Sequence, residues 1–225
     1  MNKIYILLVI INTFTFGSIP PNGFSPLFNG KDLDGWWGLK TEDPEKWLSL
    51  PVDLFKVKWE NSQKDIKKHW RVEDGILIND GNGLFLSTEK NYSDFELILE
   101  YKTVANADSG IYLRGIPQIQ IWDTSKEGGK WKLGADKGSG GLWNNGRSGT
   151  RGRDPLIHAD KPFGQWNTFH IVMIGDIVSV RLNDKLVVHR APLTNYWDRK
   201  TDIAKRKAIV SKGPIQLQTH GGEIS

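Results

Sequence analysis

Hydrophobic and polar residues alternate in short segments through most of the chain after residue 69. In residues 94–102, for example, large apolar side chains alternate with mostly charged ones, which is the two-residue period of a strand with one buried face. Roughly ten short strands separated by turns, with almost no convincing helix, predict a single all-β domain with a sandwich or jelly-roll fold. A short strand that breaks into a turn is expected at residues 27–33, followed by extended structure at residues 35–37. Further strands are expected at residues 70–72, 75–78, 83–88, 110–114, 117–123, 168–174, 177–183, 185–189 and 215–220.

Three polar segments interrupt the predicted strands. Residues 40–68 are rich in charge and are expected to form a long excursion with one short helix. Residues 128–161 lack periodicity and are expected to form a loop, and a loop this long in a compact domain usually serves a function. Residues 194–212 form a second excursion, in which residues 202–208 could be helical.

The N-terminus has the pattern of a signal peptide. Lys3 precedes an apolar run from Ile4 to Ile11, and small residues near Gly17 suit cleavage. We therefore expect a signal peptide at residues 1–18, a linker at 19–26 and the domain at 27–225, with an uncleaved anchor as the alternative. The protein is expected to be exported to the periplasm or the cell exterior, without stable membrane insertion after cleavage.

Composition narrows the chemistry further. The absence of cysteine excludes disulfides, cysteine zinc sites and thiol catalysis. The 30 basic and 26 acidic residues are scattered, and the lysines of residues 64–68 are expected to lie on a solvated surface, so nucleic-acid binding is not expected. The 10 tryptophans can fill the core or stack on sugar rings, and composition does not separate these uses.

Each predicted strand has an aliphatic face and a second face of a different kind. In residues 117–123, Ile119 and Ile121 share one face, whereas the other carries amides and an indole. An ordinary solvated face is rich in Lys, Glu, Thr and Ser, whereas amides, guanidinium and aromatic rings suit hydroxyl groups and sugar rings. If these strands share a sheet, the pattern favours a saccharide-binding face over a solvated one. The predicted substrate-binding residues are Arg114, Gln118, Gln120, Trp122 and Gln218.

Ionisable residues at strand ends supply candidate catalytic groups. His220 and Asp123 could each act as a general base or bind a metal ion, although a loop histidine and a turn cap are the alternatives. Glu96 and Glu100 share a strand face, but their Cα atoms lie about 13 Å apart, beyond the separation of roughly 5 to 9.5 Å between glycosidase carboxyl groups. Glu100 could still pair with a group on another strand. The sequence has no HExxH motif, so a metal site would have to be assembled from separate strands.

Several short motifs follow one another in a defined order: LFNGKDLDGW from residue 27, WRVEDG from 70, DFEL from 94, DSGIYLR from 108, QIQIWD from 118, KPFGQWN from 161 and QTHGG from 218. In order and spacing they resemble the 3-keto-disaccharide hydrolase domain family over residues 27–224. The resemblance implies a concanavalin-like sandwich or jelly roll, often exported from bacteria, that acts on glycosides oxidised at C3. Some members carry Glu where this chain has Gln118. The family usually continues after Gly222 with one more strand, so a sheet without its last strand is expected here.

The chemistry implied by this resemblance differs from that of ordinary glycosidases. A ketone at C3 acidifies the C2 proton, so a base can start an elimination that breaks the C1–O bond, and water can then add. We expect an enzyme with His220, Asp123 and Glu100 at the reacting centre, with a divalent metal ion as a possible cofactor held by Asp123 and His220. A non-catalytic, lectin-like sugar-binding module is the alternative. A conventional glycoside hydrolase is a third hypothesis, which would require two suitably spaced carboxyl groups.

Overall fold

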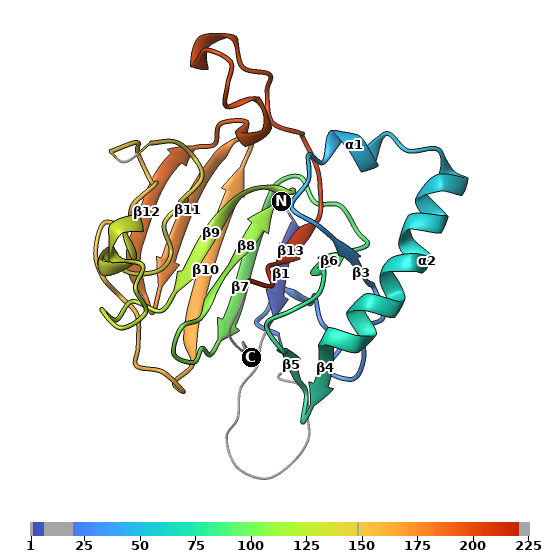
Figure 1. Ribbon diagram of the computed structural model, residues 1–225, viewed down its shortest axis with the longest axis horizontal. Coiled ribbons are helices and arrows are strands. Elements are labelled where there is room, and N and C mark those ends of the chain that lie inside the picture. The colour runs from blue at the N-terminus through green and yellow to red at the C-terminus, as the bar shows by residue number, and fades with distance from the viewer. Residues whose placement is uncertain (1, 7–19, 148, 221–225) are drawn as a thin grey trace.

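The protein folds as a β-sandwich of two stacked sheets, as the strand pattern predicted (Figure 1). The computed structural model describes residues 2–6, 20–147 and 149–220. One sheet has the strand order β12-β11-β10-β7-β1-β2, the other has the order β3-β6-β13-β8-β9, and β4 and β5 form a separate hairpin. The six-stranded sheet comprises β1 (Asn2–Ile6), β2 (Ser25–Pro26), β7 (Phe95–Tyr101), β10 (Asn167–Ile174), β11 (Ile177–Leu182) and β12 (Lys185–Pro192). The others are β3 (Trp36–Leu39), β4 (Trp70–Glu73), β5 (Ile76–Asn79), β6 (Phe85–Thr88), β8 (Asp108–Leu113), β9 (Ile116–Trp122) and β13 (Ile215–Leu217).

The core lies between the two sheets and is built from alternate residues of each strand. In the six-stranded sheet, Leu97 of β7 pairs with Ile171 of β10, and both are fully buried. In the other sheet, Ile111 of β8 pairs with Ile119 of β9, and both belong to the same core cluster. Full burial of each such side chain contributes about 1.5–3 kcal/mol, so the alternation is the main determinant of which face of each strand points inward.

Two helices cover part of the five-stranded sheet, and one of them is much longer than predicted. Helix α1 spans Glu45–Leu48 and α2 spans Val52–His69, whereas only one short helix was expected among residues 40–68. Ser62 and Ile66 of α2 are buried, and the Ser62 Oγ accepts a hydrogen bond from the Gly38 N–H of β3 at 3.0 Å. The prediction of one short helix in this segment was wrong because α2 has only two buried residues, and these lie among charged ones.

Other local predictions met mixed outcomes. The segment at residues 128–161 is a loop as expected, with 3-10 turns at Trp131–Leu133 and Ala135–Lys137. The strand expected at residues 27–33 is instead a series of bends, in which the Asn29 side chain accepts hydrogen bonds from the N–H groups of Lys31 and Asp32. The helix expected at residues 202–208 is only a 3-10 turn at Ile203–Lys205, and a second such turn lies at Tyr196–Asp198.

The N-terminal segment includes the first strand of the fold. Strand β1, which falls within the predicted signal peptide, pairs in parallel with β7 and with β2, and β2 lies in the predicted linker. Residues 7–19 lie outside the described residues, so cleavage near residue 18 stays a prediction. In the described part of the chain, no helix is long and apolar enough to cross a membrane.

Candidate active site

A polar surface lies on the outer face of the five-stranded sheet. Gln216 of β13 pairs with Tyr112 of β8 on one side and with Ser87 of β6 on the other, and Tyr112 pairs with Gln118 of β9. Paired residues point to the same side of a sheet, and their immediate neighbours point into the core, so this set faces outward. We call it the polar floor: Ser87, Asp108, Gly110, Tyr112, Gln118, Gln120, Trp122, Gln216 and Gln218.

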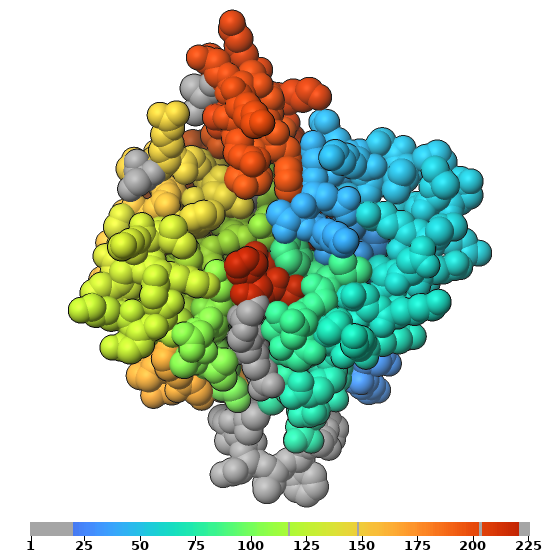
Figure 2. All heavy atoms as spheres, in the orientation of Figure 1, coloured from blue at the N-terminus to red at the C-terminus, as the bar shows by residue number. Residues whose placement is uncertain are grey.

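Three segments surround the polar floor. Figure 2 shows the residues around β13 in dark red at the centre of this face. Residues 124–147 flank them in yellow-green, α1 and α2 flank them in cyan, and residues 194–212 project above them in orange. Loops and helices rather than strands form these walls, and they come from parts of the chain that are remote in sequence.

Asp108 is the centre of a charged cluster on this floor. Its Oδ2 lies 2.5 Å from the Lys130 Nζ and 3.1 Å from the His220 Nδ1, and its Oδ1 accepts a hydrogen bond from the Gln120 Nε2 at 2.8 Å. The side chain of His220 is 63% exposed, whereas that of Asp108 is only 11% exposed. We call Asp108, Lys130 and His220 the Asp108 cluster.

The Asp108 cluster defines the tautomer of His220. An ionised carboxylate can only accept hydrogen bonds, so the Nδ1 of His220 must carry the proton that it shares with Asp108. The neutral ring then has a free lone pair at Nε2, which can remove a proton from a bound molecule. Asp108 also stabilises the imidazolium that such a transfer creates, which is the role of the carboxylate in catalytic triads.

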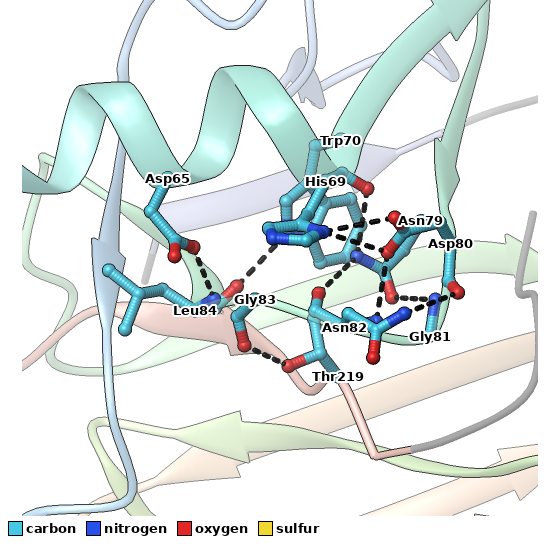
Figure 3. Close-up of polar contacts among 10 residues, drawn as sticks. All are labelled: Asp65, His69, Trp70, Asn79, Asp80, Gly81, Asn82, Gly83, Leu84 and Thr219. Atoms are coloured by element: carbon cyan, nitrogen blue, oxygen red, sulfur yellow. Dashed lines mark hydrogen bonds and ion pairs between the residues drawn. The ribbon is translucent and has the colours of Figure 1, made fainter.

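The backbone next to His220 is anchored by α2 through a short loop (Figure 3). The Thr219 Oγ1 donates a hydrogen bond to the Gly83 carbonyl at 2.7 Å. Gly83 has a φ of 83°, and a Cβ there would lie 2.6 Å from the ring of His69. His69 in turn contacts the Asp80 carboxylate at 3.0 Å, and this hydrogen bond holds the pKa of Asp80 below its usual value. The side chain of His69 is only 16% exposed, so this contact is largely shielded from solvent.

Aromatic residues line the floor and its walls. Trp122 contacts Trp143 edge-to-face with ring centroids 6.1 Å apart, and the Arg153 guanidinium lies over Trp143 at 5.6 Å. Burial raises the pKa of Tyr112 to about 12, so its hydroxyl stays protonated across the physiological range. Neutral hydroxyl, indole and amide groups therefore surround the charged cluster.

The structure brings together most of the residues predicted to bind substrate. Gln118, Gln120, Trp122 and Gln218 share the polar floor, and His220 joins them through Asp108. This common face is the arrangement that strand alternation suggested. The roles of these side chains in binding stay predictions.

Arg114 lies apart from this group. It has a φ of 58° at the turn after β8, which ends the strand alternation, so the prediction that it shares a face with the amides was wrong. Its guanidinium is buried and donates hydrogen bonds to the carbonyl oxygens of Ser93 at 3.0 Å and Val210 at 3.3 Å. It lines a different cavity, of about 490 Å³, together with Asp94.

Asp123 takes the turn-capping role rather than joining the cluster. Its carboxylate accepts hydrogen bonds from the N–H groups of Asn106 at 2.7 Å and Ser125 at 2.9 Å, and the residue is 1% exposed. Burial by itself would raise the pKa of Asp123, but the hydrogen bonds from Ser125 and Asn106 outweigh it, so the pKa lies below its usual value. Asp123 is therefore held by the backbone as an anion.

Glu100 belongs to the other sheet. It lies on β7 between the core residues Leu99 and Tyr101, so its side chain points away from the core. Its carboxylate accepts a hydrogen bond from the Thr168 Oγ1 of β10 at 3.3 Å. Glu100 is thus placed on the outer face of the six-stranded sheet and not on the polar floor.

Two members of the Asp108 cluster were not among the predicted site residues. Asp108 begins the motif DSGIYLR, and extending the alternation of Gly110 and Tyr112 back by two residues would have placed it on the same face. Lys130 lies in the wall formed by residues 124–147, where no periodic pattern indicates its direction. The partner of His220 is therefore Asp108 and not Asp123.

The described residues do not form a metal site. Among them, no group of three or more His, Asp and Glu side chains is arranged to hold a metal ion. Asp108 and His220 would supply two ligands, whereas zinc sites in proteins use three or four protein ligands. The Lys130 ammonium beside Asp108 also opposes binding of a second cation there.

Comparisons with known proteins agree with the fold and with a carbohydrate-related family. A family model described as a 3-keto-alpha-glucoside-1,2-lyase-like domain matches residues 23–225. A curated 3-keto-disaccharide hydrolase from Bacteroides thetaiotaomicron is 25% identical over 232 residues, which cover 91% of this chain and 71% of that protein.

Solved structures show the same architecture. A candidate glycosyl hydrolase from Parabacteroides distasonis superposes with a TM-score of 0.57 at 21% identity, covering 88% of each chain. A second candidate glycosyl hydrolase from that organism has a TM-score of 0.52 at 24% identity, covering 70% of this chain and 85% of the other. At these identities the similarity shows a shared fold.

Proposed function

We propose that this protein cleaves glycosidic bonds of 3-keto-glycosides. The chain belongs to the 3-keto-alpha-glucoside-1,2-lyase-like domain family of carbohydrate-active, glycosyl hydrolase-like proteins, and this family is the starting point of the proposal. The observation that carries the proposal is the contact of His220 with Asp108, beside Lys130, on a floor of amide and aromatic side chains. Such a floor suits a polyhydroxylated ring, and the histidine supplies a base at its edge.

The first step is removal of the C2 proton by the Nε2 of His220. The electron pair of the C–H bond moves into the C2–C3 bond, and the ketone oxygen at C3 becomes an enolate oxygen. Asp108 stabilises the imidazolium, and the Lys130 ammonium, next to Asp108, can donate to the enolate oxygen. General-base catalysis of this kind contributes about 100- to 10,000-fold to a rate.

The second step breaks the glycosidic bond. The enolate electrons form a C1=C2 double bond and restore the C3 ketone, while the aglycone oxygen leaves with the C1–O pair and takes up a proton. Water can then add at C1, with a proton returning to C2, so that the sum of the steps is hydrolysis. Without this addition the protein acts as a lyase.

The floor supports elimination better than a conventional glycosidase mechanism. Among the described strand positions of the five-stranded sheet that face this floor, Asp108 carries the only carboxylate. Conventional glycosidases place two carboxyl groups about 5 to 9.5 Å apart across the scissile bond. Elimination from a 3-keto-glycoside needs one base and a donor, which the Asp108 cluster supplies.

A comparison of an oxidised and an unoxidised substrate tests the proposal. The full chain and the protein without residues 1–18 are each incubated with an aryl glucoside and with its 3-keto derivative, and aglycone release is measured with and without a chelator. We expect release from the 3-keto derivative alone. His220→Ala should lower it at least 100-fold while saccharide binding persists, whereas the exposed His189 of β12 provides the matched control, His189→Ala, which should leave it unchanged.

Two outcomes would contradict the proposal. Binding of both sugars without aglycone release would favour a lectin-like module. Equal activity of the His220→Ala and His189→Ala proteins would exclude His220 as the base. Loss of activity with the chelator would identify a metal ion that the described residues alone do not hold.

We also propose that the protein is exported. The support is the charged and apolar pattern of residues 3–11, followed by small residues near residue 17. Expression with and without residues 1–18, followed by cell fractionation and N-terminal sequencing, tests this. Recovery of the uncleaved chain in the cytoplasm would contradict it.

A further inference from the structure

The side-chain oxygen of Gln118 is a buried acceptor that lacks a donor. Gln118 is 5% exposed, and its Oε1 has no hydrogen-bond partner within the described part of the chain. A buried acceptor without a partner costs about 1–3 kcal/mol, so native proteins rarely leave one unfilled unless a ligand or water supplies the donor. The orphaned oxygen lies on the polar floor, two residues along β9 from the amide that contacts Asp108.

Asp108 determines which end of each amide faces which neighbour. The carboxylate accepts only, so Gln120 must turn its Nε2 toward Asp108, as the 2.8 Å contact shows. The Oε1 of Gln120 is then an acceptor and receives the Nε2 of Gln118. Gln118 therefore has to present its Oε1 to the ligand, and a flip of this amide would set oxygen against oxygen. The negative charge of Asp108 thus determines, through Gln120, that Gln118 presents an acceptor and not a donor.

A second orphaned acceptor lies beside the same spot. The Gln218 Oε1 is also buried without a partner among the described residues. It lies 3.1 Å from the position that a Cβ on Gly110 would occupy, and the Gln118 Cβ lies 3.2 Å from that position. Because Gly110 has no side chain, the two glutamines, which both offer oxygen, can come close together over this strand.

We infer that Gln118 recognises a hydroxyl group of the sugar as a hydrogen-bond donor above Gly110, and that it selects substrates in which this hydroxyl is free. The identity of the sugar rests on the proposed function, but the requirement for a donor follows from the amide polarity alone. A sugar hydroxyl that donates to this buried oxygen is removed from bulk water. If that hydroxyl is replaced by hydrogen, the Gln118 oxygen is left without a hydrogen-bond donor. Sugars that are deoxy or methylated at that position are rejected.

Deoxy substrates test this selection. The ratio of kcat/KM for the parent 3-keto-glucoside to that for its 4-deoxy and 6-deoxy analogues is measured in the wild-type protein and in Gln118→Met. We expect a ratio of about 10 to 100 at one of the two positions in the wild type. In Gln118→Met, which keeps the side-chain volume and loses the acceptor, the same ratio should fall to near 1.

Gln216 provides the matched control. It is a buried amide on the same floor, but its Nε2 already donates to the Ser87 Oγ at 3.1 Å, and it is not part of the chain of amides from Asp108. Gln216→Met should keep the wild-type ratio even if it lowers overall activity. A general disturbance of the floor would lower all rates together and leave every ratio unchanged, so the ratio isolates recognition.

Each outcome bears on the inference. Ratios near 1 at both positions in the wild type, as a trapped water molecule at Gln118 would produce, overturn it. If Gln118→Met does not fold, Gln118→Asn is used instead, because its shorter side chain moves the oxygen away from the ligand. In that variant the kcat/KM ratio should fall to near 1. If the parent 3-keto-glucoside is not turned over, the proposed function fails. The recognition is then tested by measuring the dissociation constants of methyl glucoside and of its deoxy analogues and comparing their ratios. No binding of any of these sugars overturns both proposals.

Discussion

Replacement of Thr219 by Val tests the anchor that holds the backbone next to His220. The substitution keeps the shape of the side chain and removes the hydroxyl that donates to the Gly83 carbonyl at 2.7 Å. Thr219 is 8% exposed, so water replaces the lost donor poorly. A carbonyl left without a partner in such a place costs about 1–3 kcal/mol.

The free energy of unfolding should therefore fall by about 1–3 kcal/mol in Thr219→Val, which corresponds to a Tm lower by roughly 2–12 °C for a chain of this size. Urea unfolding followed by tryptophan fluorescence measures the first quantity, and a thermal melt measures the second. Turnover of the 3-keto-glycoside should fall mainly in kcat, because His220 loses its fixed position while the polar floor stays intact.

Thr219→Ser is the control for this experiment. It keeps the hydroxyl and loses one methyl group, so it should cost no more than about 0.8 kcal/mol and should retain kcat. The reasoning is refuted if Thr219→Val unfolds at the same urea concentration as the wild type. A Val variant that is less stable but fully active would show that the anchor supports the fold and not the position of His220.

Three further changes follow from contacts of the site. Asp108→Asn should lower kcat about 100-fold or more without preventing folding, because His220 loses the charge that orients it, and unchanged kcat would exclude this role. Gly110→Ala places a Cβ 2.8 Å from the Ile119 carbonyl, so urea unfolding should show a loss of about 1–3 kcal/mol. Because the pKa of Asp123 is lowered in the folded state, its stabilising contribution is complete above about pH 4 and is lost as the pH falls through the lowered value. Asp123→Asn should therefore flatten the acid side of a stability–pH curve, and an unchanged slope would contradict this.

Strand alternation predicted the polar floor well because β9 and β13 follow it without interruption. The two-residue period alone placed Gln118 and Gln120 on one face of their strand, and the register of β8, β9 and β13 shows that Gln218 shares this face. Arg114 departed from the pattern because a single residue with positive φ ends the alternation at the turn. The sequence does not reveal such a residue when it is not glycine.

Features that depend on long-range contacts could not be predicted in the same way. The direction of Lys130 is set by the conformation of a loop, and its contact with Asp108 joins positions 22 residues apart. Helix α2 was underestimated because its buried residues are few and its exposed face is charged, although Ser62 and Ile66 lie four residues apart as neighbours on one helix face. Asp123 rather than Asp108 was placed at the reacting centre with His220. Both aspartates lie at strand ends, and only the fold shows that the Asp123 carboxylate already accepts hydrogen bonds from the backbone.

The floor and its walls are built from different kinds of chain segment, so under the proposed function they can be changed separately. The floor is formed by strands that come from distant parts of the sequence. Each surrounding wall is instead one continuous segment, and the three segments are residues 40–69, 124–147 and 194–212 (Figure 2). A change in a wall that keeps the packing of Ser62 and Ile66 and the contact of Val210 with Arg114 should therefore preserve the strand register that aligns Asp108 with its neighbours. The segment at residues 194–212 holds no member of the Asp108 cluster and makes no contact in the Thr219 anchor. It is therefore the wall in which substitutions intended to change substrate specificity should disturb the Asp108 cluster least.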